Sequence, residues 1–93
     1  MLSDNALDVA LALRKYIGAD TTGVGPEIAK LVTLVEKAGA ELLSALNELE
    51  QLGFVRVNRG QGKLHLGIPK ELRGIVGVAV LEPLQVYLDE LGP

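Results

Sequence analysis

The sequence contains no cysteine and few aromatic residues: one phenylalanine, two tyrosines and no tryptophan. The lack of cysteine excludes disulfides, thiolate metal sites and a thiol nucleophile, and we expect a cytoplasmic protein. Because aromatics are scarce, a hydrophobic core must be built from leucine, valine, isoleucine and alanine. Such a core favours helices with aliphatic stripes.

The sequence also lacks a long hydrophobic run. The longest, Ile75 to Leu81, has seven residues even when Gly77 is counted, far short of the ~20 residues of a membrane-spanning helix. The first residues lack the positive charge and apolar run of a signal peptide, so we expect no membrane association. With 93 residues, 48% of them hydrophobic and 23% charged, the composition indicates one globular domain over residues 1–93.

The chain has no overall excess of positive charge. Its net charge is −3, which by itself argues against a nucleic-acid binder. The distribution is uneven, however. Residues 1–50 have a balance of −4 and residues 71–93 a balance of −3, whereas residues 51–70 contain four basic residues and no acid. Residues 51–70 are therefore a local positive feature of an acidic chain.

Two helices are predicted in the first 40 residues. Ser3 or Asp4 suits the N-cap of a helix over residues 4–17, because a side-chain oxygen there accepts from an unpaired amide of the first turn. Pro26 suits the first position of a second helix, since its ring fixes φ and its missing amide is not needed there. The apolar face that follows extends this helix to about Lys37.

A third helix is predicted over residues 40–52. Gly39 separates it from the second helix, and Gly53 ends it. Two helices joined by a short glycine-containing turn form a helix-turn-helix unit. Five apolar residues of the third helix share one face: Leu42, Ala45, Leu46, Leu49 and Leu52.

A β-hairpin is predicted after the third helix. Val55 and Val57 mark one arm, Leu64 and Leu66 mark the other, and residues 58–62 form the turn. Apolar and polar residues alternate on both arms, which is typical of a sheet buried on one side. The polar residues on the arms are Arg56, Asn58, Lys63 and His65.

Residues 70–91 carry apolar residues at roughly helical spacing. Glycines and β-branched residues weaken the helical pattern, and Pro83 should kink or split a helix. We expect one kinked helix or two short ones, and the alternative is a strand over residues 75–81. The apolar residues of this segment include Leu72, Ile75, Val76, Ala79, Val80, Leu84 and Leu88.

Residues 4–69 resemble winged-helix transcription regulators of the broad bacterial and archaeal type. The likeness rests on Ile28-Ala29-Lys30-Leu31 at the start of the second helix and on the run ALNELEQLGFV at residues 45–55. It implies an α+β, mainly α fold. That fold is a winged helix-turn-helix with three helices, a β-hairpin wing and a C-terminal helical segment over residues 70–93.

The resemblance implies that the third helix lies in a DNA major groove. The helix turns Ser44, Asn47 and Gln51 away from its apolar face, and asparagine and glutamine can bond adenine edges. Glu41 and Glu48 share that outward face, and residues 38–55 contain no basic residue. An ordinary solvated helix face is therefore the alternative, because acids are repelled by a phosphate backbone.

The resemblance also implies that the wing contacts phosphates or the minor groove. Its basic residues lie on or beside two glycines that let the backbone approach a ligand closely. The alternative is that these charges only keep an exposed strand edge from pairing with other chains. The candidate contacts in the wing are Arg56, Arg59, Lys63 and His65.

In the resembled regulators the terminal helices commonly pair two subunits. Residues 70–91 contain more apolar surface than a three-helix domain needs, and a large apolar patch usually marks an interface. We therefore predict a homodimer whose interface is formed by seven of the apolar residues of this segment: Leu72, Ile75, Val76, Ala79, Val80, Leu84 and Leu88. The alternative is that the segment folds back over its own core.

No catalytic or cofactor site is predicted. The run Gly23-Val24-Gly25-Pro26 lacks the lysine and the serine or threonine of a phosphate loop. His65 is the only histidine, and a zinc site would need further ligands that the chain does not supply. We therefore expect neither an enzyme nor a bound metal.

The sequence thus predicts a small homodimeric transcription regulator that binds double-stranded DNA through residues 40–52 and 54–68. The alternative function is a winged-helix module that binds a protein partner through its acidic third helix and does not bind DNA.

Overall fold

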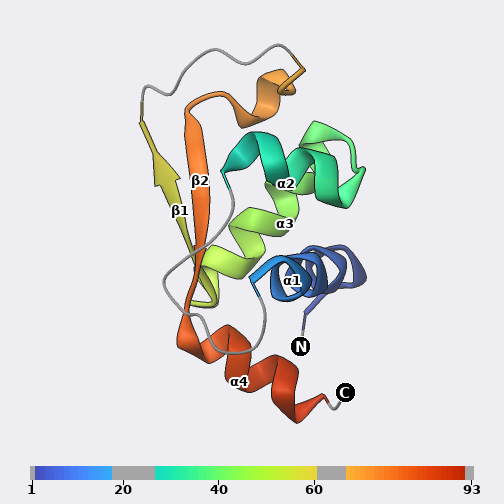
Figure 1. Cartoon of the computed structure of the whole chain (residues 1–93), viewed down its shortest axis with the longest axis vertical. Helices are drawn as coiled ribbons and strands as arrows, with labels where there is room; N and C mark the ends of the chain where they lie inside the picture. Colours follow the sequence, from blue (N-terminus) through green and yellow to red (C-terminus); the bar gives the residue numbers. More distant parts are fainter. Residues whose placement is uncertain (1, 18–26, 61–66, 92–93) are drawn as a thin grey trace.

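The computed structural model describes residues 2–17, 27–60 and 67–91. Over these residues the chain forms four α-helices, a short 3-10 helix and a two-stranded antiparallel sheet (Figure 1). In chain order the elements are α1 (Asp4–Ile17), α2 (Ile28–Val35), α3 (Gly39–Gln51), β1 (Val55–Arg59), η1 (Lys70–Leu72), β2 (Ile75–Val80) and α4 (Glu82–Glu90). The chain is therefore α+β and mainly helical, as predicted.

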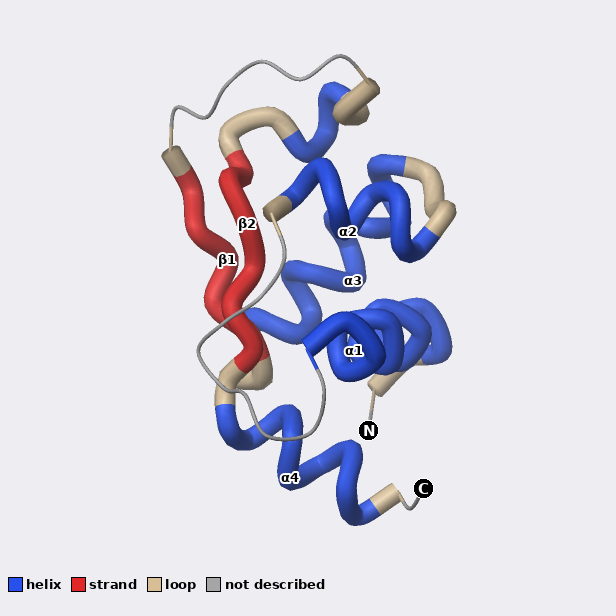
Figure 2. Tube along the Cα trace, viewed as in Figure 1, coloured by secondary structure: helices blue, strands red, loops and turns tan. Residues whose placement is uncertain are grey.

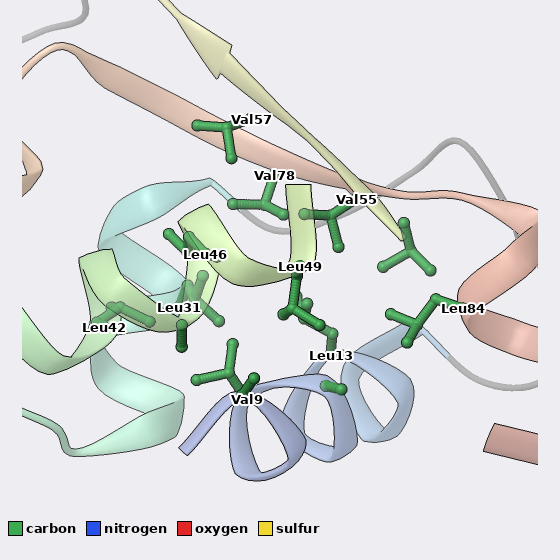
Figure 3. Close-up of a cluster of buried hydrophobic side chains, with 14 of the residues drawn as sticks. Val9, Leu13, Leu31, Leu42, Leu46, Leu49, Val55, Val57, Val78 and Leu84 are labelled. Carbon is green, nitrogen blue, oxygen red and sulfur yellow. The ribbon is translucent and has the colours of Figure 1, made fainter. Parts of the chain in front are cut away.

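The strands β1 and β2 run along one side of the molecule, and α1, α2 and α3 lie on the other (Figure 2). The core fills the space between them, and leucines of the helices meet valines of both strands there (Figure 3). The buried core of the described residues contains only aliphatic side chains. The prediction from the scarcity of aromatics is therefore confirmed for this part of the chain.

The bounds of α1 and α3 agree closely with the prediction. The Ser3 hydroxyl accepts from the Ala6 amide at 3.1 Å, so Ser3 caps the start of α1. At the end of α3, Gly53 adopts a positive φ of 75°. The Phe54 amide donates to the Leu49 carbonyl at 2.9 Å, which is the bond that closes a helix ending in glycine.

The helix α2 is shorter at both ends than predicted. It begins at Ile28 instead of Pro26 and ends at Val35 instead of near Lys37. It ends there because Glu36 turns into the left-handed region, with φ of 50°, and donates back to the Val32 carbonyl at 3.4 Å. Only residues 36–38 then separate α2 from α3.

Gly39 is the first residue of α3 and does not break a helix, contrary to the prediction. A Cβ atom at this position would lie 2.5 Å from the Cβ of Pro69 and 2.6 Å from Oε1 of Glu71. Glycine is therefore needed because η1 and the residue before it pack directly on the start of α3.

The partner of β1 differs from the predicted hairpin. The strand β1 pairs with β2, with Val55 opposite Val80 and Asn58 opposite Gly77. The predicted second arm, with Lys63 and His65, lies outside the described residues. The connection from β1 to β2 is thus residues 60–74, which is much longer than the tight turn that we predicted. Because the two strands lie so far apart in the sequence, no pattern of neighbouring residues predicts that they pair.

Residues 70–91 do not form a kinked helix. They form η1, the strand β2 and the helix α4, so the strand that we gave as the alternative is the one observed. The run Ile75–Val80 is rich in β-branched residues, which favour a strand. Pro83 lies in the first turn of α4 and therefore starts a helix instead of kinking one.

The predicted dimer interface is largely internal. Six of its seven residues are buried within this chain, namely Leu72, Ile75, Ala79, Val80, Leu84 and Leu88. The exception is Val76, which is 41% exposed. The prediction that these six residues face a second subunit is wrong, because they are already buried within this chain, and all but Ala79 belong to its core cluster. The segment folds back over its own core, as the alternative stated.

The second edge of β2 also has a partner. Glu27, just before α2, forms an isolated antiparallel bridge with Gly77. The strand β2 therefore lies between β1 and Glu27. No helix among the described residues is long and apolar enough to cross a bilayer.

Candidate nucleic-acid interface

The helix α3 carries a stripe of exposed polar side chains. Ser44, Asn47 and Gln51 are all exposed, and their spacing places them on one side of the helix. The opposite side is buried and consists of Leu42, Ala45, Leu46 and Leu49. The predicted outward orientation of the three polar residues is confirmed, whereas their contact with DNA remains a prediction.

We predicted that Glu48 lies on the outward face of the third helix. In the structure its carboxylate is hydrogen-bonded to Ser3, just before α1. Its Oε2 accepts from the Ser3 amide at 2.8 Å, and its Oε1 accepts from the Ser3 hydroxyl at 2.7 Å. The bond from the amide and then that from the hydroxyl lower the pKa of the Glu48 carboxyl below its ordinary value of 4.5. This acid of α3 is therefore part of the contact between α1 and α3.

Glu50, in the last turn of α3, pairs with Arg59 at the end of β1. Nη2 of Arg59 lies 3.1 Å from Oε1 of Glu50, and Nη1 lies 3.2 Å from Oε2. The hydrogen bond from Arg59 is the main cause that lowers the pKa of the Glu50 carboxyl, and the same bond raises the pKa of Arg59. Arg59, which we predicted as a phosphate contact, is therefore already engaged by a carboxylate.

Arg56 is a second predicted wing residue that the structure describes. Its side chain is exposed on β1, between the buried residues Val55 and Val57. It forms no hydrogen bond or ion pair within the described part of the chain. None of the described residues therefore neutralises its charge. Lys63 and His65, the other predicted contacts, lie outside the described residues.

Two further basic residues belong to the connection between β1 and β2. Lys70 in η1 and Arg73 just after it are exposed. Neither forms an ion pair with another described residue. We had assigned both to a C-terminal helical segment, so they were missing from the predicted site. The charge pattern could have included Lys70, which falls in the basic segment 51–70, but Arg73 is preceded by Glu71 and gave no such signal.

Two other basic residues have partners among the described residues and stabilise the fold. Arg14 donates to the Leu88 carbonyl at 3.2 Å and pairs with Asp89 at 3.1 Å. Lys37 pairs with Asp8 at 3.4 Å. These cations connect α1 to other parts of the molecule and are not candidates for ligand contact.

Nothing in the described residues forms a metal centre. No group of three or more His, Cys, Asp or Glu side chains is placed there so that it could hold a metal ion. The chemistry on the surface of the described residues is that of hydrogen bonding and charge: a polar stripe on α3, and on the side of the strands the exposed cations Arg56, Lys70 and Arg73, which form no ion pair with a described residue. Comparison of the chain with models of protein families, with curated proteins and with solved structures found no match.

Proposed function

We propose that the chain is a winged helix-turn-helix protein that binds duplex DNA and acts as a small transcription regulator. The observation that carries the proposal is the exposed stripe of Ser44, Asn47 and Gln51 on α3, directly after the turn at residues 36–38. A helix that follows such a turn and presents polar side chains suits the major groove.

The order of the elements supports the proposed fold. Helix α1 precedes the bridge at Glu27, which is followed by α2, α3 and the strands β1 and β2. The strands β1 and β2, with their connection at residues 60–74, then correspond to the wing. Its anchored part, η1, packs against the start of α3, so the proposed wing and recognition helix are held in a fixed relation.

The charges near α3 are less unfavourable for DNA than the sequence suggested. Two of the three acids on this helix are engaged inside the molecule, Glu48 by Ser3 and Glu50 by Arg59. Glu41 remains an exposed acid. Arg56, Lys70 and Arg73 supply the cations for phosphate contacts, which provide most of the non-specific affinity for DNA.

Binding to duplex DNA across a salt titration tests the proposal. Arg56→Ala should weaken binding to all sequences alike and reduce the salt slope by about 1. Asn47→Ala should cost about 1–3 kcal/mol on a preferred site and relax its sequence preference. Lys15→Ala, which removes an exposed cation from α1, is the matched control and should leave both quantities unchanged.

The second candidate function is a module that binds a protein through α3. The net charge of −3 and the absence of basic residues from 38 to 55 favour it. A failure to shift mixed duplex DNA at low salt and micromolar protein would support this candidate and contradict DNA binding. Recovery of a partner that is lost in the Asn47→Ala variant would then identify the surface.

A further inference from the structure

The pair formed by Glu50 and Arg59 has a second component, the backbone of Val57. The Val57 amide donates to Oε2 of Glu50 at 3.2 Å, and Nη1 of Arg59 donates to the Val57 carbonyl at 3.4 Å. Together with the two bonds between the side chains, these contacts form a closed arrangement at the end of α3. We refer to Glu50, Arg59 and the Val57 peptide groups as the clamp.

The clamp lies on the edge of β1 that faces away from β2. The Leu81 amide donates to the Phe54 carbonyl at 3.0 Å, which makes Phe54 and Leu81 a hydrogen-bonded pair of the antiparallel ladder. Such pairs alternate along the strands. With the observed register, Val57 falls at a position whose amide and carbonyl point away from β2. The clamp therefore occupies backbone groups that the sheet itself does not use.

We propose that Glu50 is an intramolecular competitor that withholds Arg59 from the phosphates of nucleic acid. In the free protein the guanidinium is held by the carboxylate. When the protein binds duplex DNA, Arg59 exchanges this carboxylate for a phosphate. The inference rests on the proposed function, because it names the step by which one wing cation of that site becomes available.

The geometry favours an exchange that costs little. The side chain of Arg59 is 53% exposed and that of Glu50 is 34% exposed, so the ion pair is screened by water. Glu50 keeps the Val57 amide as a donor after Arg59 leaves, and its carboxylate is not left without a partner. A phosphate offers the guanidinium the same two-point hydrogen bonding that the carboxylate does.

Four proteins test the exchange: the wild type, Glu50→Gln, Arg59→Gln and the double variant, each measured for affinity to the same duplex DNA. Glu50→Gln keeps the size of the side chain and can still accept from Val57. It should raise affinity about two- to five-fold, which is the range expected for an exposed pair. In the Arg59→Gln background, Glu50→Gln should have no such effect. Glu41→Gln, on the same helix, is the control for the loss of one negative charge.

The outcomes separate the clamp from DNA binding itself. If Glu50→Gln strengthens binding equally with and without Arg59, or no more than Glu41→Gln does, the effect is one of net charge and the clamp is overturned. If the wild type binds DNA and Glu50→Gln binds equally well, the clamp alone is overturned. If no variant binds duplex DNA, both the proposed function and the clamp are overturned. If only the Glu50→Gln protein binds duplex DNA measurably, the result supports both the proposed function and the clamp.

The closed state of the free protein has its own readout. A guanidinium held at two points rotates slowly, so the Nη resonances of Arg59 should be separate in the wild type and should merge in Glu50→Gln. Merged resonances in the free wild type would overturn the closed clamp. Circular dichroism of all variants establishes that each is folded before affinities are compared.

Discussion

Gly39 shows how a single missing side chain fixes the position of a distant segment. Its backbone is helical, so alanine would usually be more stable there: alanine is favoured over glycine inside a helix by about 1 kcal/mol. However, the added Cβ would lie 2.5 Å from Pro69 and 2.6 Å from Glu71, which are atoms of the segment around η1. Packing should therefore override helix propensity at this position.

We predict that Gly39→Ala lowers the free energy of unfolding by about 1–3 kcal/mol, which is typical of overpacking. Urea unfolding measures the change. Ala40→Gly, one residue further along the same helix and exposed, is the control that reports helix propensity alone. A Gly39→Ala protein that is more stable than the wild type would contradict the close approach of Pro69.

Glu48 provides a pH-dependent link between α1 and α3. Its pKa in the folded protein is lowered by the hydrogen bonds from Ser3. A group with a lowered folded pKa stabilises the protein above its ordinary pKa, and this contribution is lost as the pH falls through the folded value. The contribution of Glu48 should thus be complete at neutral pH and should disappear below 4.5.

We predict that Glu48→Gln is less stable than the wild type at neutral pH and that the difference shrinks as the pH falls below 4.5. Unfolding by urea at a series of pH values gives this difference directly. Glu41→Gln removes an exposed acid from the same helix and controls for net charge. A difference that stays constant down to low pH would mean that the carboxylate form of Glu48 has no special role.

At the scale of elements, α4 shows that the C-terminal segment belongs to the core. Leu84 and Leu88 are fully or almost fully buried, whereas Val86 on the same helix is 49% exposed. Leu84 and Leu88 therefore face the core of this chain, whereas Val86 faces outward.

We predict that Leu84→Ala lowers the free energy of unfolding by about 2–5 kcal/mol, as for other buried leucines. Val86→Ala, the control, should change it by less than ~0.5 kcal/mol. The loss in Leu84→Ala should not depend on protein concentration, because the contacts lie within one chain. A loss that grows on dilution would instead indicate that Leu84 is buried between subunits.

The elements also show what local patterns can and cannot predict. The leucine stripe and Gly53 were enough to place α3, because each acts over a few residues of one helix. The strand β2 was mistaken for a helix because apolar residues at 72, 75, 76 and 79 have helical spacing. Its β-branched residues favoured a strand only weakly, and the pairing with β1 that fixes it joins residues far apart in the sequence.

The same limit applies to the candidate site. The outward residues of α3, such as Asn47, followed from periodicity alone. The pairing of Arg59 with Glu50 did not, since it joins a helix and a strand whose relative placement depends on the turn at Gly53 and Phe54. Likewise, Arg73 could be recognised as part of the connection between the strands only once β2 was known.

At the scale of the whole molecule, the predicted homodimer now has few residues left to form it. The exposed large apolar residues near the C-terminal end are Val76, Val86 and Leu91. We still predict a dimer, because two copies would present two α3 helices to two half-sites about 34 Å apart. Light scattering tests it: a mass near 9.9 kDa at micromolar concentration would contradict the dimer.

The contact between Arg14 and the end of α4 bears on how the chain folds during synthesis. Arg14 reaches the carbonyl of Leu88 and the carboxylate of Asp89, so its side chain is fixed by residues that are made 74 and 75 positions later. The strand β1 likewise waits for β2 before its ladder can form. While the chain is still on the ribosome, α1 and α3 can pair, but the core stays open on the side of β2 and α4. The domain should therefore reach its native state only after residue 88 has left the exit tunnel, and a nascent chain stalled before that point exposes its leucines to chaperones.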